Sequence, residues 1–449
     1  MEMFLLGAGA SRNAGVPLAF DMTSEILARM PVDSRHYRVL TFVIGGLLFR
    51  QGEAGKNPLS GQVNVEDLFN AVQLLAERNT LEAAPFVGSW HAGVQELDRR
   101  VENLRSERIS RVIFEAIWKE IAATIPRGGD LDDFAVNNRV LELVRAVSQN
   151  WSSYTVGGYG SVGRSISEHI EKYLKRWAGN LRSRSSESSA VDNAMEAAIN
   201  ASREVDGEGE IFASTTRAMT ALLRDLVWIE DSAKVEYLKP LASLGADQSR
   251  VVIATLNYDN SIELMAENAG ISCNTGIDQW CEGQEITCAA EGLILLKLHG
   301  SIDWRFRDEI PEVGKRLETR VVEKVQADQV KTNHAPAVIF GQRNKLRADG
   351  PFLGILRAFG QELENAKRLN VIGYSFADQH VNEYITRWFN RDEQRRLRVV
   401  APNFDKNSAA FARILRQQAG ERLEVVNAKA EDALPELCNP KQMQLDSSL

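Results

Sequence analysis

The chain has 449 residues, of which 44% are hydrophobic and 25% are charged, and its formal net charge at pH 7 is −8. This length exceeds what one ordinary hydrophobic core needs, so we expect two or more domains. The acidic balance argues against a protein that coats nucleic acid, since that role needs a basic surface. No apolar run approaches the roughly 18 residues that a membrane-spanning helix requires, so no membrane role is expected.

Cysteine usage and the amino terminus both favour a cytoplasmic protein. No CxxC pair occurs among the cysteines, which are expected to be free thiols in a reducing compartment: Cys273, Cys281, Cys288 and Cys438. The apolar start of the chain is too short for a signal peptide and carries Glu2 where a basic residue is expected. Basic stretches at 99–111 and 172–184 have helical spacing and are interpreted as solvated helix faces, so direct nucleic-acid binding is not expected.

The predicted elements alternate between strands and helices over much of the chain. Short apolar runs predict strands, and the segments 261–268 and 352–367 between them have helical periodicity. Such alternation is typical of an α/β fold with a doubly wound, mostly parallel Rossmann-like sheet. The predicted strands are residues 2–7, 250–256, 293–298, 337–340, 368–373, 397–401 and 423–427.

Residues 71–245 show a different pattern, with few strand signals. Their amphipathic stretches predict a large helical domain inserted into the α/β domain: 71–79, 94–125, 131–150, 165–182, 191–204 and 212–227. The predicted α/β domain is therefore discontinuous and comprises residues 1–70 and 246–437, followed by a tail at 438–449.

The first predicted strand leads into a glycine turn that is typical of nucleotide sites. Two glycine residues separated by a single residue allow a sharp turn, and the following helix start can hold an anion through its N–H groups. Arg12 stands where the dinucleotide fingerprint has its third glycine, which counts against a plain oxidoreductase. An ordinary strand-to-helix turn is the alternative interpretation. The residues predicted to hold a pyrophosphate are Gly7, Ala8, Gly9, Ala10 and Ser11.

Three further predicted strands end in polar segments. These are Thr255–Asp259, Leu298–Trp304 and Gly373–Asp378. The carboxyl ends of parallel strands meet at one edge of a sheet, where doubly wound folds bind ligands. We therefore expect these segments to lie together beside the glycine turn.

In this order, the segments GAGAS (with GVP downstream), TLNYD, LHGSIDW and GYSFAD resemble sirtuin-like NAD-binding proteins, in particular the bacterial sirtuin-like domains of anti-phage defence systems. The resemblance implies that the α/β domain binds NAD. It also implies an NAD+ glycohydrolase that cleaves NAD to nicotinamide and ADP-ribose and depletes NAD during phage infection. Two alternatives remain: an NAD-dependent protein deacylase or ADP-ribosyltransferase, and a non-catalytic sensor of NAD or ADP-ribose.

The resemblance also assigns catalytic residues. Asn257 takes the position of the family's catalytic asparagine, and His299 is the expected general base. Asp259 is expected to contact the nicotinamide amide or to stabilise positive charge on the ribose. The alternatives are that Asn257 or Asp259 caps the helix near residue 261 and that His299 is a buried structural histidine.

Further assignments concern the ribose groups of NAD. Gly373, Tyr374 and Ser375 match the ribose-proximal turn of the family, and Asn403 is expected near the adenosine ribose. Turn chemistry or helix capping is the alternative interpretation for each of these residues.

Zinc and partners are the last expectations. In zinc-bearing sirtuins two cysteine pairs follow the histidine, whereas residues 305–335 contain no cysteine, so we predict no zinc. The resemblance implies NAD as a substrate, a homo-oligomer, and a partner protein such as a HerA-type ATPase or an Argonaute-like protein. Nothing in the sequence selects between these partners.

Overall fold

A computed structural model of the chain describes residues 2–59, 61–78, 211–247, 250–277, 280–309, 319–326, 330, 336–338, 350–406, 408, 411, 414 and 420–439. The chain divides into two compact units. The first comprises Met1–Val32, Thr41–Ala71 and Arg217–Leu449, and the second comprises Asp33–Leu40 and Val72–Thr216. The predicted helical stretches between residues 79 and 210 lie outside the described residues.

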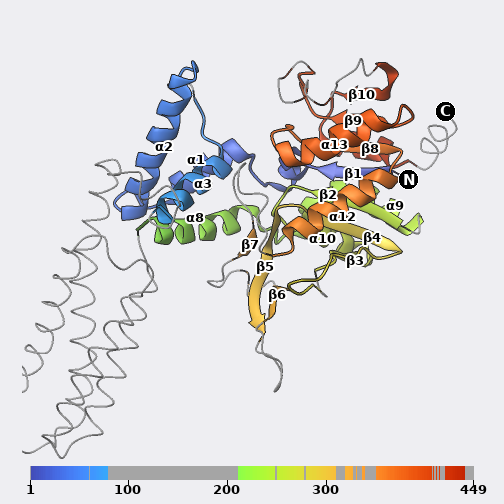
Figure 1. Cartoon of the computed structure of the whole chain (residues 1–449), viewed down its shortest axis with the longest axis horizontal. Coiled ribbons are helices and arrows are strands. Elements are labelled where there is room, and N and C mark those ends of the chain that lie inside the picture. The colour runs from blue at the N-terminus through green and yellow to red at the C-terminus, as the bar shows by residue number, and fades with distance from the viewer. Residues whose placement is uncertain are drawn as a thin grey trace, which may run out of the picture. The chain divides into compact units, whose positions relative to one another are not determined.

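A seven-stranded sheet forms the centre of the first unit, and every neighbouring pair of its strands is parallel. The order is β10-β9-β8-β1-β2-β4-β3, which confirms the predicted doubly wound sheet (Figure 1). The chain runs outward from β1 through β2 and β4, and then returns to place β8 on the other side of β1. The strands are β1 Glu2–Leu6, β2 Arg250–Thr255, β3 Cys273–Asn274, β4 Gly292–Lys297, β8 Arg368–Ile372, β9 Arg396–Val400 and β10 Leu423–Val426.

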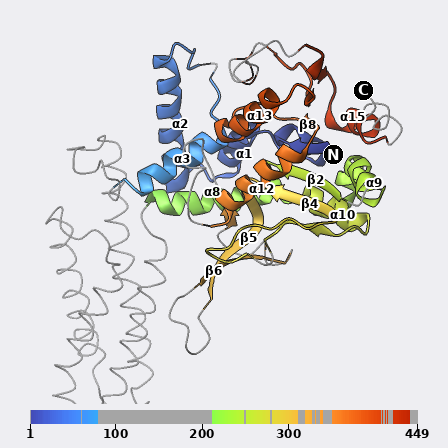
Figure 2. The same ribbon diagram turned by 45° about the vertical axis from the view of Figure 1, so that its right-hand side comes forward.

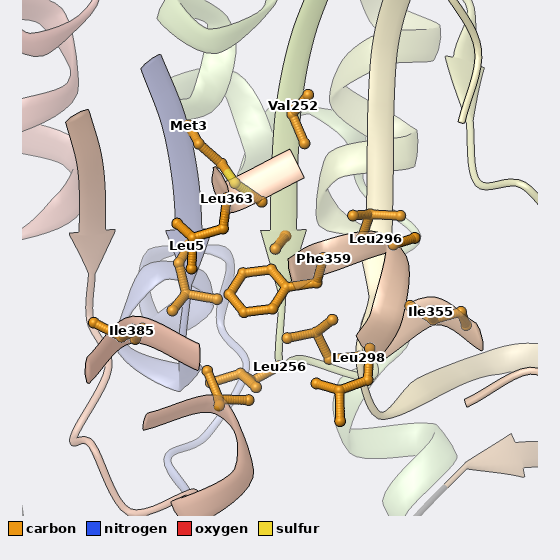
Figure 3. Close-up of a cluster of buried hydrophobic side chains, with 14 of the residues drawn as sticks. Met3, Leu5, Val252, Leu256, Leu296, Leu298, Ile355, Phe359, Leu363 and Ile385 are labelled. Atoms are coloured by element: carbon orange, nitrogen blue, oxygen red, sulfur yellow. The ribbon is translucent and has the colours of Figure 1, made fainter. Parts of the chain in front are cut away.

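The central strands are apolar on both faces because helices cover both. On one face, Phe359 of α12 (Phe352–Asn365) lies over Leu5 and Leu296 in a cluster that also includes Ile385 of α13 (Gln379–Arg391) (Figure 3). Strand residues that alternate with these point to the opposite face. There, α9 (Lys239–Asp247) contacts β2 and β4. Such two-sided burial is typical of parallel sheets and explains why the strands appear as continuous apolar runs.

A separate three-stranded antiparallel sheet follows the fourth strand of the large sheet. It has the order β6-β5-β7, with β5 at Gly300–Glu309, β6 at Thr319–Lys324 and β7 at Pro336–Val338. β5 and β6 extend away from the parallel sheet (Figure 2). One expectation is therefore corrected: the predicted strand 337–340 overlaps β7, which does not join the parallel sheet. Charged residues along β5 and β6 hide the strand pattern, since these strands are partly exposed.

The remaining helices include α3 (Val65–Ala76) and α8 (Ile211–Val227), both predicted from periodicity, although α3 begins before the predicted 71–79. Residues after 216 belong to the first unit because the 3-10 helix η3 (Ser232–Leu238) contacts α10 and α15 as well as α9. The predicted insertion of 71–245 is thus longer than the second unit at its carboxyl end. The other helices are α1 Ala19–Arg29, α2 Arg35–Glu53, α10 Ser261–Asn268 and α15 Ala430–Leu437.

In the described part of the second unit, two side-chain contacts join segments that are distant in the sequence. The His36 Nδ1 and Thr215 Oγ1 atoms lie 3.0 Å apart, and the Arg78 guanidinium stands 5.2 Å from the centre of the Phe212 ring. Across all described residues, no helix combines the length and apolar character needed to cross a membrane.

Candidate functional site

The glycine turn after β1 packs directly on the turn after β8. The Gly7 N–H donates to the Ile372 carbonyl and the Gly9 N–H donates to the Gly373 carbonyl, each at 2.9 Å. A Cβ at Gly7 would stand 2.6 Å from the Tyr374 Cα, and one at Gly9 would stand 2.8 Å from the Gly373 Cα. Both distances are shorter than a side chain tolerates, so this turn needs glycine in order to bring two backbones together at the switch point of the sheet.

Three N–H groups of this turn have partners within the protein. The turn forms the 3-10 helix η1 (Ala8–Ala14), in which the Ala10 N–H donates to the Gly7 carbonyl at 2.9 Å. The N–H groups of Gly7, Gly9 and Ala10 are therefore engaged by carbonyl groups. Pyrophosphate binding by the five predicted residues, which also include Ala8 and Ser11, remains a prediction.

Asn257 links the loop after β2 to the turn after β1. Its side-chain Nδ2 donates to the Gly7 carbonyl at 3.0 Å and to the Ser11 hydroxyl at 2.8 Å. A carbonyl oxygen only accepts hydrogen bonds, so the amide nitrogen must face Gly7 and the orientation of the amide is defined. The amide oxygen is hydrogen-bonded to none of the described residues.

Asp259 contacts the start of α10 through one oxygen of its carboxylate. One carboxylate oxygen accepts a hydrogen bond from the Ser261 N–H at 3.0 Å, where α10 begins. Its other oxygen, Oδ2, is buried and has no hydrogen-bond partner among the described residues. The cap position of α10 is Asn260, so one Asp259 oxygen binds the N–H of the first helical residue, and the other is a buried acceptor without a partner among the described residues.

His299 and Asp378 form a buried pair. The Nε2 atom of His299 lies 2.8 Å from the Oδ2 atom of Asp378, and the two side chains are 4% and 5% exposed. A carboxylate can only accept, so Nε2 carries the proton and, in the neutral ring, Nδ1 is the basic nitrogen. Nδ1 is buried without a partner among the described residues. This arrangement can accept a proton from a water molecule or a hydroxyl group.

Asp378 is itself held rigidly at the start of α13. Its Oδ1 accepts hydrogen bonds from the N–H groups of His380 and Val381, so it caps the helix. The Tyr374 hydroxyl accepts a hydrogen bond from the Asp378 N–H at 3.0 Å and donates to the Asn382 side chain at 2.9 Å. Burial, with a smaller contribution from Asp378, raises the pKa of Tyr374 well above its usual range, so its hydroxyl stays protonated.

The residues predicted to bind the ribose groups lie in two places. Tyr374 is buried and its hydroxyl serves Asp378, whereas Ser375 is exposed in the same turn. Asn403 is exposed after β9 with a φ of 54°, and its N–H donates to the Asn427 side chain at 2.7 Å. The structure thus joins Gly373 and Tyr374 to the site and places Asn403 beside the residue that follows β10.

The sheet brings Asn257 and His299 to one edge. Thr255 is paired with Leu6 of β1 on one side and with Lys297 of β4 on the other. Asn257 and His299 each follow the end of a strand by two residues, on neighbouring strands about 4.8 Å apart. They therefore emerge from the same carboxyl-terminal edge, next to the Gly7 turn.

Sequence reasoning missed three residues around this site. Asp378 lies in a recognised motif, but only the fold shows that it pairs with His299. The Tyr258 hydroxyl donates to Glu66 of α3 at 3.4 Å, and the Tyr258 ring lies 6.2 Å from the His299 ring. No local pattern signals Glu66, because its partner is distant in the chain. Within the described ranges, no cluster of histidine, cysteine and acidic residues could hold a metal ion.

Comparison with known proteins found one matching family and several similar solved structures. Residues 251–423 match the family described as SIR2-like domain, which covers three of the four motifs. Similar solved structures include a triple mutant of a Sir2 homologue with 2'-O-acetyl ADP-ribose, at 15% identity over 53% of this chain and 78% of that chain, with a TM-score of 0.31. Another is a mutant Sir2 homologue with ADP-ribose, at 14% identity over 53% and 76% of the two chains, with a TM-score of 0.30.

No curated protein matches the chain. The family match nevertheless falls on the segments that supply Asn257, His299 and Asp378, and these segments meet at one edge of a doubly wound sheet. Residues 251–423 of this chain therefore match the SIR2-like domain that its motifs predict.

Proposed function

We propose that this protein is an NAD+ glycohydrolase that cleaves NAD to nicotinamide and ADP-ribose. The observation that carries the proposal is the buried His299–Asp378 pair, whose unpaired Nδ1 lies at the same sheet edge as the Asn257 amide. The SIR2-like family match supports NAD as the substrate. The remaining support is the resemblance of the four motifs to sirtuin-like NAD-binding proteins.

The reaction needs a positioned water molecule and a base. The bond between the ribose C1′ and the nicotinamide nitrogen breaks, and its electron pair leaves with nicotinamide, which becomes neutral. The water oxygen bonds to C1′, and the water proton passes to Nδ1 of His299, while Asp378 stabilises the imidazolium that forms. The free amide oxygen of Asn257 accepts a hydrogen bond from the water or from a ribose hydroxyl.

Asp259 has a secondary role in this proposal. Its Oδ2 atom is buried and unpaired among the described residues, and a negative charge there favours the positive charge that develops on the ribose. Burial of His299 and Asp378 excludes bulk water, which strengthens these electrostatic interactions.

The direct test is incubation of the purified chain with NAD and measurement of nicotinamide. We expect wild-type turnover and a loss on the order of 10²-fold in Asn257→Ala, the usual range for one catalytic group. Asn268→Ala, which changes an exposed asparagine at the end of α10, serves as the matched control and should keep wild-type activity. Equal activity in Asn257→Ala and wild type would remove Asn257 from the site.

The same assay separates the alternative acceptors. Free ADP-ribose is the expected product, whereas a deacylase would release 2′-O-acyl ADP-ribose only when an acylated peptide is present. A transferase would leave ADP-ribose on protein. Thermal stabilisation by NAD without any product would identify a sensor instead.

We further propose that the activity depletes NAD in bacterial anti-phage defence, as a homo-oligomer with a partner such as a HerA-type ATPase or an Argonaute-like protein. The support is the motif resemblance. Light scattering measures the oligomer directly. Phage challenge of cells that express wild type or Asn257→Ala tests the role, with a fall in cellular NAD and fewer plaques expected only for wild type.

A further inference from the structure

A fully buried lysine joins the strand that precedes His299 to the loop that carries Asn257. Lys297 is the last residue of β4, and its side chain is 0% exposed. Its Nζ donates to Oε1 of Glu263 at 2.7 Å and to the main-chain carbonyl of Asp259 at 2.5 Å. A buried ammonium group is costly unless charged and polar partners surround it, so these contacts need an explanation.

The charges around Lys297 keep it protonated. Burial lowers its pKa, but Glu263 and Asp303 outweigh burial, so the pKa lies above its usual value. Asp303 is also fully buried and accepts a hydrogen bond from the Ser301 hydroxyl. A second lysine, Lys324, lies 3.6 Å from the Asp303 carboxylate but is 46% exposed. The cluster therefore contains two lysines. Lys297 is buried and contacts the loop, whereas Lys324 is partly exposed and lies near Asp303.

The loop at residues 257–260 is held at every residue. The Asn257 side chain binds the turn after β1, and the Tyr258 carbonyl accepts a hydrogen bond from the Ile302 N–H at 3.1 Å. The Asp259 carbonyl binds Lys297, and the Asn260 side chain exchanges two hydrogen bonds with the backbone of Ile229. The contacts from Lys297 and Ile302 come from residues that flank His299, so they set the loop relative to the imidazole.

We infer that Lys297 is a positioning residue that fixes the Asn257 loop against His299 through the carbonyl of Asp259 and through Glu263. The expected effect on the reaction rate rests on the proposed NAD hydrolysis, whereas the expected effect on the position of the loop does not. Loss of the Lys297 contact should let the loop move by a fraction of an ångström or more, and misplacement of about 1 Å can cost on the order of 10² in rate.

The test replaces both partners, because removal of Lys297 alone would leave Glu263 buried and unpaired. In Lys297→Met with Glu263→Met, the Asp259 carbonyl loses its donor while the volume stays similar. We expect faster hydrogen–deuterium exchange in the peptide 255–268 and unchanged exchange in the β9 peptide. For NAD turnover, we expect kcat to fall by about tenfold or more and KM to stay within about threefold.

Lys324→Met is the matched control, since it removes a lysine from the same cluster without touching the loop, and it should behave as wild type in both assays. Wild-type exchange in the double variant would overturn the inference whether or not the chain hydrolyses NAD. Faster exchange with unchanged kcat in an active enzyme would overturn it too. An inactive wild type refutes the proposed function alone, because exchange still reports on the loop. If the double Met variant does not fold, Lys297→Gln with Glu263→Gln is measured by the same criteria.

Discussion

The imidazole of His299 and the carboxylate of Asp378 lie 2.8 Å apart, although 79 residues separate them in the chain. His299 follows β4 and Asp378 precedes α13, which comes after β8. β1 and β2 lie between those strands in the sheet, so the pair spans the edge above both of them. The pair therefore joins segments that follow strands on either side of β1 and β2, whose own ends lead into the Gly7 turn and the Asn257 loop.

Asp378→Asn tests the role of the carboxylate. An asparagine still caps α13, but it no longer stabilises an imidazolium and can also hold the ring in the other tautomer. We expect kcat to fall on the order of 10²-fold with little change in melting temperature. Asp392→Asn, at the exposed carboxyl end of the same helix, is the control. Wild-type turnover in Asp378→Asn would show that the pair is structural.

Tyr374→Phe removes a hydroxyl that the fold uses internally. The Asp378 N–H would lose its acceptor in a buried place, at a cost of about 1–3 kcal/mol in the free energy of unfolding. Urea unfolding measures this loss. If Tyr374 instead acted mainly on the ribose, stability would hardly change and KM for NAD would rise.

Gly9→Ala tests whether the glycine turn is needed for packing as well as for ligand binding. An added Cβ would meet the Gly373 backbone, so we expect a loss of about 1–3 kcal/mol in stability even without NAD. Gly45→Ala, on the exposed face of α2 with nothing within 4 Å, is the control and should stabilise the protein by about 0.5–1 kcal/mol. A stable Gly9→Ala protein that has lost only NAD binding would contradict the packing explanation.

Alkaline pH should destabilise the protein through buried tyrosines. Burial raises the pKa of Tyr374 and Tyr258 well above the usual value of about 10, with Asp378 and Glu66 adding to it. In the unfolded chain these tyrosines ionise near pH 10. Their contribution to the free energy of unfolding is therefore intact below that pH and is lost as pH rises toward the folded pKa. Each group then reduces the free energy of unfolding by about 1.4 kcal/mol per pH unit.

The measurement is the free energy of unfolding from pH 8 upward together with the ultraviolet signal of tyrosinate. Tyr258→Phe should flatten the alkaline decline relative to wild type. Ionisation of all tyrosines near pH 10 with no loss of stability would refute the expectation.

The strands of the large sheet could be predicted because each is a local run of apolar residues that both sheet faces require. Val251–Ala254 and Leu293–Leu296 are examples, and each ends at a polar segment of the site. β5 could not be found in this way. It is an antiparallel, partly exposed strand with Arg305 and Arg307 on it, so its residues resemble a polar loop.

Local signals in the chain thus settle where strands end and which side chains stand at those ends, including Asn257 and His299. Their partners depend on the fold, because hydrogen bonds and ion pairs form between groups that only the sheet order makes neighbours. The placement of β8 next to β1 brings Asp378 beside His299 and Gly373 against the Gly7 turn. The placement of β4 next to β2 brings Lys297 into contact with Glu263. Burial then makes each of these pairings obligatory, since an isolated charge or donor in the interior is too costly to keep.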